Sequence, residues 1–107
     1  MKKVIWSPTA RRSLKRTSDF ILNLWNEQVR AEFINQLNFR ITQIQKNPEL
    51  GPSFEDSDIR KLVTHQSVSM FYLNFPEHVR ILLIWDNRQN AAELYRKLTD
   101  ANRPKDP

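Results

Sequence analysis

The sequence predicts an α+β domain in which a helical hairpin packs on one face of a small, mainly antiparallel sheet. Three observations lead to this fold class. A short β-rich segment opens the chain, two amphipathic helical segments follow with almost no chain between them, and three short apolar segments are separated by tight turns. The expected element order is therefore β-α-α-β-β-β-α. The length of 107 residues suits one domain, which we expect over residues 1–98, followed by a polar tail over residues 99–107.

The first half of the chain has the pattern of a helical hairpin. Residues 3–6 are rich in β-branched and aromatic side chains and predict a strand. Ser7 and Pro8 then provide an N-cap and a first helical residue. The residues expected on the buried face of this helix recur at helical spacing: Ala10, Leu14, Thr17, Ile21, Leu24 and Trp25. Asn26 caps a second helix that ends at Asn47, so the two helices must lie antiparallel.

The second half of the chain predicts a three-stranded meander. Its apolar segments cover residues 59–64, 68–75 and 78–85, and the turns between them are too short for anything but antiparallel pairing. The third segment is apolar on both faces, which predicts a central strand covered from both sides. Residues 91–98 predict a short terminal helix.

The net charge of +5 comes from the first half of the chain. Residues 1–50 hold nine basic and four acidic side chains, whereas residues 51–107 hold eight of each. Four of the bases lie on the outward face of the first predicted helix: Arg11, Arg12, Lys15 and Arg16. A one-sided field of this kind favours an acidic partner, although a solvated basic helix face produces the same pattern.

The composition excludes several kinds of functional site. The absence of cysteine excludes disulfides and thiolate zinc sites, and a single glycine, Gly51, excludes a glycine-rich phosphate-binding loop. His65 and His78 have no second ligand at metal-binding spacing, so we expect neither a metal nor a cofactor. The longest apolar run, residues 81–85, is far shorter than a membrane span, and no signal peptide is recognisable. We therefore expect a cytoplasmic protein.

Basic side chains also accompany the predicted sheet. Arg60 and Lys61 lie on its first antiparallel strand, Arg80 lies on the last strand, and Arg88 follows that strand. If these groups converge near Tyr95 on the terminal helix, they would bind a phosphodiester and stabilise negative charge that develops on it. The alternative is a set of structural ion pairs: Arg88 with Asp86 or Glu93, and Arg60 with Asp56 or Asp58.

Four segments stand in a recognisable order: Val4-Ile5-Trp6-Ser7-Pro8, Asn47-Pro48-Glu49-Leu50-Gly51-Pro52, Tyr72 in the middle strand, and Trp85-Asp86-Asn87-Arg88-Gln89. Over residues 3 to about 98 the chain resembles the RelE/ParE superfamily, the toxins of bacterial type II toxin–antitoxin modules, which are often called plasmid-stabilisation proteins. The resemblance implies a growth-inhibiting toxin that a cognate acidic antitoxin neutralises in a hetero-oligomer. We expect the antitoxin to bind the basic helix face: Arg11, Arg12, Lys15 and Arg16.

Within this superfamily, RelE-like members cleave mRNA on the translating ribosome without a metal. If the chain is such an endoribonuclease, the resemblance and the sheet cations together name the residues expected to act: Lys61, Arg80, Arg88 and Tyr95. Two groups of the RelE pattern are missing, however. Ser69 and Met70 stand where an arginine of the middle strand is expected, and a second strand lysine would fall at Ile59. Each missing donor weakens the stabilisation of a charged transition state, by about 2.7–4 kcal/mol in a well-studied case.

ParE-like members instead poison DNA gyrase and have no known catalytic set. The long hairpin and the Asp-Asn-Arg-Gln segment are closer to that side, so we prefer a ParE-like toxin. The residues expected to contact the target are Arg60, Lys61 and Arg88. A third hypothesis is an inactive relic that only binds its antitoxin. The sequence leaves these three alternatives open.

Overall fold

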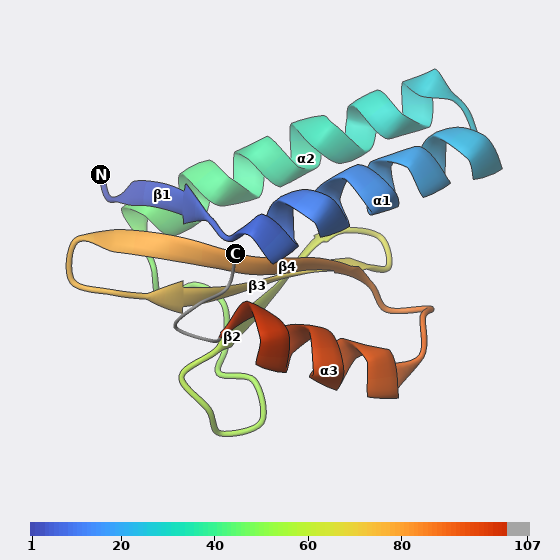
Figure 1. Cartoon of the computed structure of the whole chain (residues 1–107). Coiled ribbons are helices and arrows are strands. Elements are labelled where there is room, and N and C mark those ends of the chain that lie inside the picture. Colours follow the sequence, from blue (N-terminus) through green and yellow to red (C-terminus); the bar gives the residue numbers. More distant parts are fainter. Residues whose placement is uncertain (103–107) are drawn as a thin grey trace.

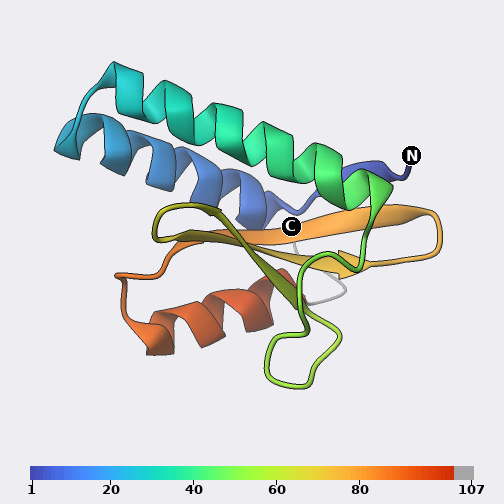
Figure 2. The ribbon, with the colours of Figure 1, turned by 180° about the vertical axis from the view of Figure 1, so that it is seen from behind.

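A computed structural model describes residues 1–102 of the chain and confirms the predicted element order. Helices α1 and α2 form an antiparallel hairpin on one face of a four-stranded sheet, and helix α3 covers the other face (Figure 1). The same three layers are visible from behind (Figure 2). The elements are β1 (Lys3–Trp6), α1 (Pro8–Leu24), α2 (Glu27–Lys46), β2 (Arg60–His65), β3 (Val68–Asn74), β4 (His78–Asp86) and α3 (Ala91–Ala101).

Strand β4 is central, as its double-sided apolar pattern predicts. The strand order is β1-β4-β3-β2, with β1 parallel to β4 and the other pairs antiparallel. A shift in the register between β3 and β4 places Tyr72 opposite Ile81 but Phe71 opposite Leu83, so Leu82 is an extra residue. Such a bulge reverses the alternation of faces. Ile81 therefore packs toward the hairpin, whereas Leu82 and Leu83 pack toward α3.

Helix α1 completes the edge of β4 that β1 leaves open. Strand β1 pairs only with residues 78–81 of β4. Beyond that point, the Ser7 hydroxyl donates to the carbonyl oxygen of Leu82 at 3.1 Å, and the Ser13 hydroxyl accepts from the Ile84 N–H at 2.9 Å. Both serines are buried. These bonds satisfy polar groups of the strand that would otherwise be buried without a partner.

The predicted buried face of α1 is wrong at its C-terminal end. Leu24 and Trp25 are 51% and 59% exposed, because the connected end of the hairpin projects past the sheet (Figure 1). The rest of the buried face is mostly small or polar: Thr9, Ala10, Ser13, Thr17, Ser18 and Ile21. Small side chains here allow α1 to approach β4 closely enough for its serines to reach the strand.

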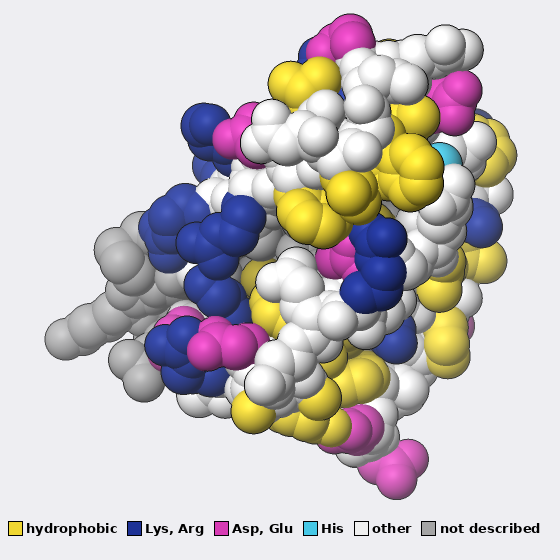
Figure 3. Space-filling view, turned by 90° about the vertical axis from the view of Figure 1, so that its right-hand side faces the viewer, with side chains coloured by type: hydrophobic (Ala, Val, Ile, Leu, Met, Phe, Trp, Pro, Cys, Tyr) yellow, Lys and Arg dark blue, Asp and Glu magenta, His cyan; other side chains and the backbone are white. Residues whose placement is uncertain are grey.

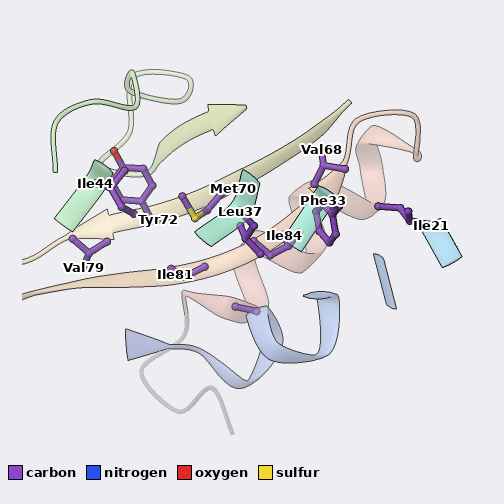
Figure 4. Packing of buried hydrophobic residues seen from close by; sticks show 11 residues of the cluster. Ile21, Phe33, Leu37, Ile44, Val68, Met70, Tyr72, Val79, Ile81 and Ile84 are labelled. Carbon is purple, nitrogen blue, oxygen red and sulfur yellow. The ribbon is translucent and has the colours of Figure 1, made fainter. Parts of the chain in front are cut away.

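Two apolar clusters hold the layers together. The larger one lies between the hairpin and the sheet, where Phe33, Leu37 and Ile44 of α2 pack against β3 and β4 (Figure 4). The smaller one joins α3 to the opposite face of the sheet. Helix α3 runs three residues beyond its predicted end at Leu98, because Ala101 is fully buried in this second cluster. Residues 99–101 are thus helical rather than part of a tail, and residues 103–107 lie outside the described part of the chain.

The loop after α2 is tied to the sheet by Tyr72. Its hydroxyl donates to the carbonyl oxygen of Pro48 and accepts from the N–H of Gly51, both at 2.8 Å. A Cβ atom at Gly51 would lie only 2.9 Å from this hydroxyl and 3.1 Å from the Lys61 carbonyl oxygen, so any other residue would displace the Tyr72 ring or the loop. Arg60 adds a bond of 2.8 Å to the Gly51 carbonyl oxygen and one of 3.2 Å to that of Glu49. Arg60 therefore secures backbone carbonyls of the loop rather than a carboxylate.

We predict that Tyr72→Phe lowers the free energy of unfolding by about 1–3 kcal/mol, because the buried Gly51 N–H and the Pro48 carbonyl oxygen both lose their partner. Tyr95→Phe is the matched control, since Tyr95 is exposed and should change stability by no more than about 0.5 kcal/mol. Urea denaturation of the three proteins measures both values. Equal stability of Tyr72→Phe and the native chain would show that this brace does not contribute to the fold.

Candidate functional site

The four bases of the first helix form an exposed face on α1, as predicted: Arg11, Arg12, Lys15 and Arg16. Two of them have partners on the same helix. Lys15 forms an ion pair of 2.7 Å with Asp19, and Arg12 donates to the hydroxyl of Thr9 at 3.1 Å. Exposed pairs of this kind contribute little to stability. The face therefore remains a basic surface that is accessible to solvent.

The structure adds two residues of α3 to this surface. Arg96 and Lys97 lie beside Arg12 and Arg16, and together we call these four residues the α1–α3 cluster. Partial burial, reinforced by the charges of Arg16, Arg96 and Arg12, holds the pKa of Lys97 below its usual value. Figure 3 shows Lys and Arg side chains gathered on this side of the molecule. Sequence reasoning missed the cluster because α1 and α3 are far apart in the chain.

Asp86 and Arg88 form the polar centre of a corner at the end of β4. The Asp86 side chain is only 2% exposed and accepts from the Arg88 Nε at 2.9 Å, the Arg88 backbone N–H at 2.9 Å and the Ser67 hydroxyl at 3.1 Å. These bonds, above all those from the Arg88 guanidinium, lower the pKa of Asp86. The structural ion pair proposed for Arg88 from the sequence is therefore present, with Asp86 as its partner.

Arg88 nevertheless remains half exposed, at 52% of its side chain. Its guanidinium carbon lies 5.6 Å from the ring centre of Phe20 on α1, a cation–π contact. Leu24 and Trp25 are exposed on the following turn of the same helix. Figure 3 shows hydrophobic side chains beside a pair of opposite charges in this region. An arginine held rigidly beside exposed aromatic side chains is typical of a protein-binding surface.

A small cavity connects this corner to the α1–α3 cluster. It has a volume of about 280 Å³. Its walls are formed by Arg16, Thr17, Phe20, Asp86, Arg88 and Gln89. Arg16 belongs to both features, because it lines the cavity and its charge lowers the pKa of Lys97. The cavity is smaller than the roughly 300–1,000 Å³ of a typical small-molecule site, and its size suits one inserted side chain.

Arg88 is separated from the other residues expected of a ribonuclease. Arg80 and Asp86 are six residues apart on β4, about 20 Å at a rise of about 3.3 Å per residue, and Arg88 lies beyond Asp86. Arg88 contacts α1 on the hairpin side. Lys61 lies 6.0 Å from the ring centre of Phe71, on the face that α3 covers. Arg80 is directed to the same face, because it alternates with Val79 and Ile81, which pack toward the hairpin.

Two further positions of the ribonuclease pattern have structural partners. The Tyr95 hydroxyl donates to the Glu55 carboxylate, which raises the pKa of Tyr95. Ser69, at the position of the missing arginine, is fully buried and its hydroxyl accepts from the Asn87 side chain at 2.8 Å. An arginine at Ser69 would therefore carry a charge into the interior.

Two other kinds of feature are absent from residues 1–102. Within residues 1–102, no group of three or more metal-binding side chains lies together. No helix in this part of the chain is long and apolar enough to cross a bilayer. A larger hollow, about 910 Å³, lies beside the loop that precedes β2 and is lined by Asp56, Asp58 and Arg60 among other residues.

Comparison with known proteins identifies the family. The family model described as "ParE toxin of type II toxin-antitoxin system, parDE" matches residues 4–91. A comparison with curated proteins finds no match. Among solved structures, a chain of the "Chromosomal ParDE TA system from P. aeruginosa" superposes with a TM-score of 0.67 at 18% identity, covering 78% of this chain and 94% of that one. At that identity the likeness concerns the fold alone. The family match spans most of the sequence, and the chain therefore belongs to the ParE toxin family of type II toxin–antitoxin systems.

Proposed function

We propose that this ParE-family toxin stops bacterial growth by acting on DNA gyrase and that a cognate acidic antitoxin neutralises it in the cytoplasm. The observation that carries the proposal is the family match over residues 4–91. A binding mechanism requires an exposed surface that contacts a partner protein, and the corner around Arg88 has the composition of one.

The separation of Arg88 from the other cationic residues favours this proposal over an endoribonuclease. Catalysis of phosphodiester cleavage needs donors that converge on one transition state. Arg80 and Arg88 lie toward opposite ends of β4, and Arg88 contacts the hairpin side, whereas Lys61 lies on the α3 side of the sheet. The Tyr95 hydroxyl bonds to Glu55. The two arginines of this set therefore do not share a surface.

Among the residues expected to contact the target, Arg88 is the best placed. Arg60 is bound to backbone carbonyls of the loop after α2. Lys61 lies over the ring of Phe71. Arg88 is half exposed and rigidly oriented, and it adjoins the exposed side chains of Phe20 and Trp25. Arginine and aromatic residues dominate the energetics of protein interfaces.

The basic face of α1 is the proposed contact for the antitoxin. It presents Arg11, Arg12, Lys15 and Arg16 to solvent. Arg11 also ends the first turn of the helix and Arg12 follows it, near the positive end of the dipole, where cations are disfavoured by about 0.3–1 kcal/mol. Residues that break such a local rule are candidates for a functional role. An acidic segment bound here would relieve this unfavourable arrangement.

We predict that induced expression of the chain without an antitoxin stops the growth of a bacterial host and produces DNA double-strand breaks with altered plasmid supercoiling. Breaks are expected because a ParE-like toxin poisons gyrase. Gel analysis of plasmid topoisomers and mapping of mRNA ends, both from the same cultures, make up the measurement. Prominent mRNA cleavage on ribosomes would instead support the endoribonuclease, and normal growth with abundant soluble protein would support the inactive relic.

We predict that Arg88→Ala/Asp86→Asn folds but has lost most of its toxicity. Replacing both residues removes the guanidinium without leaving a buried carboxylate unpaired, a defect that Arg88→Ala alone would introduce. Loss of an interface arginine that contributes about 2 kcal/mol of binding free energy would raise the dose needed for growth arrest by roughly 30-fold. Growth curves at graded induction, with thermal melting of the purified proteins, measure this. Full toxicity of the double variant would restrict Arg88 to its role as the partner of Asp86.

We predict that the affinity of the antitoxin falls about tenfold or more between about 0.05 M and 0.5 M salt, because part of the contact is exposed charge. Arg12→Glu/Arg16→Glu should abolish most of this salt dependence. Lys3→Glu/Lys46→Glu carries the same change in charge on exposed residues outside α1 and is the control. Calorimetric titration with the product of the adjacent gene provides the data. An affinity that responds neither to salt nor to the α1 variant would place the antitoxin elsewhere.

A further inference from the structure

We propose that the α1–α3 cluster and the cavity beside Phe20 form one binding site for an extended acidic protein segment. The segment places one apolar side chain in the cavity and carboxylates two and four residues away against the cluster. This inference rests on the proposed function, because it specifies the chemistry of the acidic partner, and it adds Lys97, Arg96 and the cavity to the predicted contact surface.

The cluster is only partly neutralised within residues 1–102, because the carboxylate of Glu93 acts on Arg96, Lys97 and Arg16 together. Arg96 forms an ion pair with Glu93, but neither Arg16 nor Lys97 forms one with a carboxylate of this part of the chain. The pKa of Lys97 is lowered by partial burial and by three neighbouring guanidinium groups. Such a group of like charges raises the energy of the free protein. A bound carboxylate lowers it, so anion binding is favourable at this position.

The cavity distinguishes between an acidic protein segment and a nucleic acid. Its lining from α1 includes the ring of Phe20 and the side chain of Thr17, and Arg16 connects it to the cluster. A nucleic acid would need an open aromatic face on which a base could stack. The guanidinium of Arg88 already lies over the ring of Phe20. The site therefore suits an apolar side chain next to carboxylates, which a protein segment provides.

The spacing of the residues along α1 determines the register of the segment. Phe20 lies four residues after Arg16 and eight after Arg12, which corresponds to about 6 Å and 12 Å along the helix axis. An extended chain advances about 3.3 Å per residue and directs every second side chain to the same side. An acidic residue two positions from the apolar one would therefore lie at Arg16 and Lys97. An acidic residue four positions from it would lie at Arg12.

The test uses the purified full-length chain and synthetic fluorescent peptides of serine, one leucine and two glutamates. Matched peptides are made in both chain directions, with the glutamates two and four residues after the leucine or two and four residues before it. Shifted peptides have the same composition, but their glutamates stand one and three residues from the leucine. We expect the matched peptide to bind about tenfold more tightly than the shifted one. Lys97→Glu should weaken its binding about tenfold, and Lys46→Glu, on α2, less than about twofold.

Three outcomes would overturn the inference. Equal binding of the matched and shifted peptides would mean that only the total charge is recognised. Unchanged binding by both Lys97→Glu and Phe20→Ser would place the peptide elsewhere. Tighter binding of a twelve-residue thymidine oligonucleotide, lost in Lys97→Glu, would make the cluster a nucleic-acid site. Peptide binding is measured without growth arrest or gyrase, so the two proposals can fail separately. A toxic chain that does not bind the matched peptide contradicts this inference alone. A chain that binds the peptide but is not toxic contradicts only the proposed toxin function.

Discussion

The structure depends on how the backbone groups at the open edge of strand β4 are hydrogen-bonded. This strand is buried on both faces and pairs fully with β3, but β1 covers only its first four residues. The remaining backbone groups of its open edge need partners, because unpaired polar groups in the interior are costly. Ser7 and Ser13 of α1 meet this need. The edge of β4 thus determines how close α1 lies, and the small residues of the α1 face are the consequence.

The position of α1 then determines the functional surface. Because α1 follows the edge of β4, its outer face lies next to α3, and Arg12 and Arg16 meet Arg96 and Lys97. At the other end of the strand, Phe20 reaches Arg88, whose guanidinium is oriented by the buried carboxylate of Asp86. One structural requirement in the core therefore places both the basic cluster and the aromatic corner.

Local patterns in the sequence predict the elements but not the contacts between them. The helices, strands and caps follow from periodicity and from residues such as Ser7 and Asn26, and the resemblance to the family follows from the order of short segments. The exposure of Leu24 and Trp25 does not follow, because it depends on how far the hairpin extends beyond the sheet. The bulge at Leu82 cannot be predicted from the sequence either, since the residues on both sides of it are apolar and would fit either face of the sheet. For the site, the residue types were predictable, whereas the meeting of α1 with α3 depends on tertiary packing.

Local ion pairs balance only part of the charge around the α1–α3 cluster. Two acidic residues of the second half of the chain form local ion pairs, Glu93 with Arg96 and Asp86 with Arg88. Arg16 and Lys97 form no ion pair of this kind in the described chain. Glu93, one turn before Lys97 on α3, already reduces the repulsion at Lys97, but it forms its ion pair with Arg96, and the pKa of Lys97 stays below its usual value. One shared carboxylate leaves the free protein with an excess of positive charge that an external anion would reduce. A partner that brings carboxylates together with an apolar side chain would gain binding energy from both the relieved repulsion and the filled cavity, and a solvated ion would gain it from the first alone.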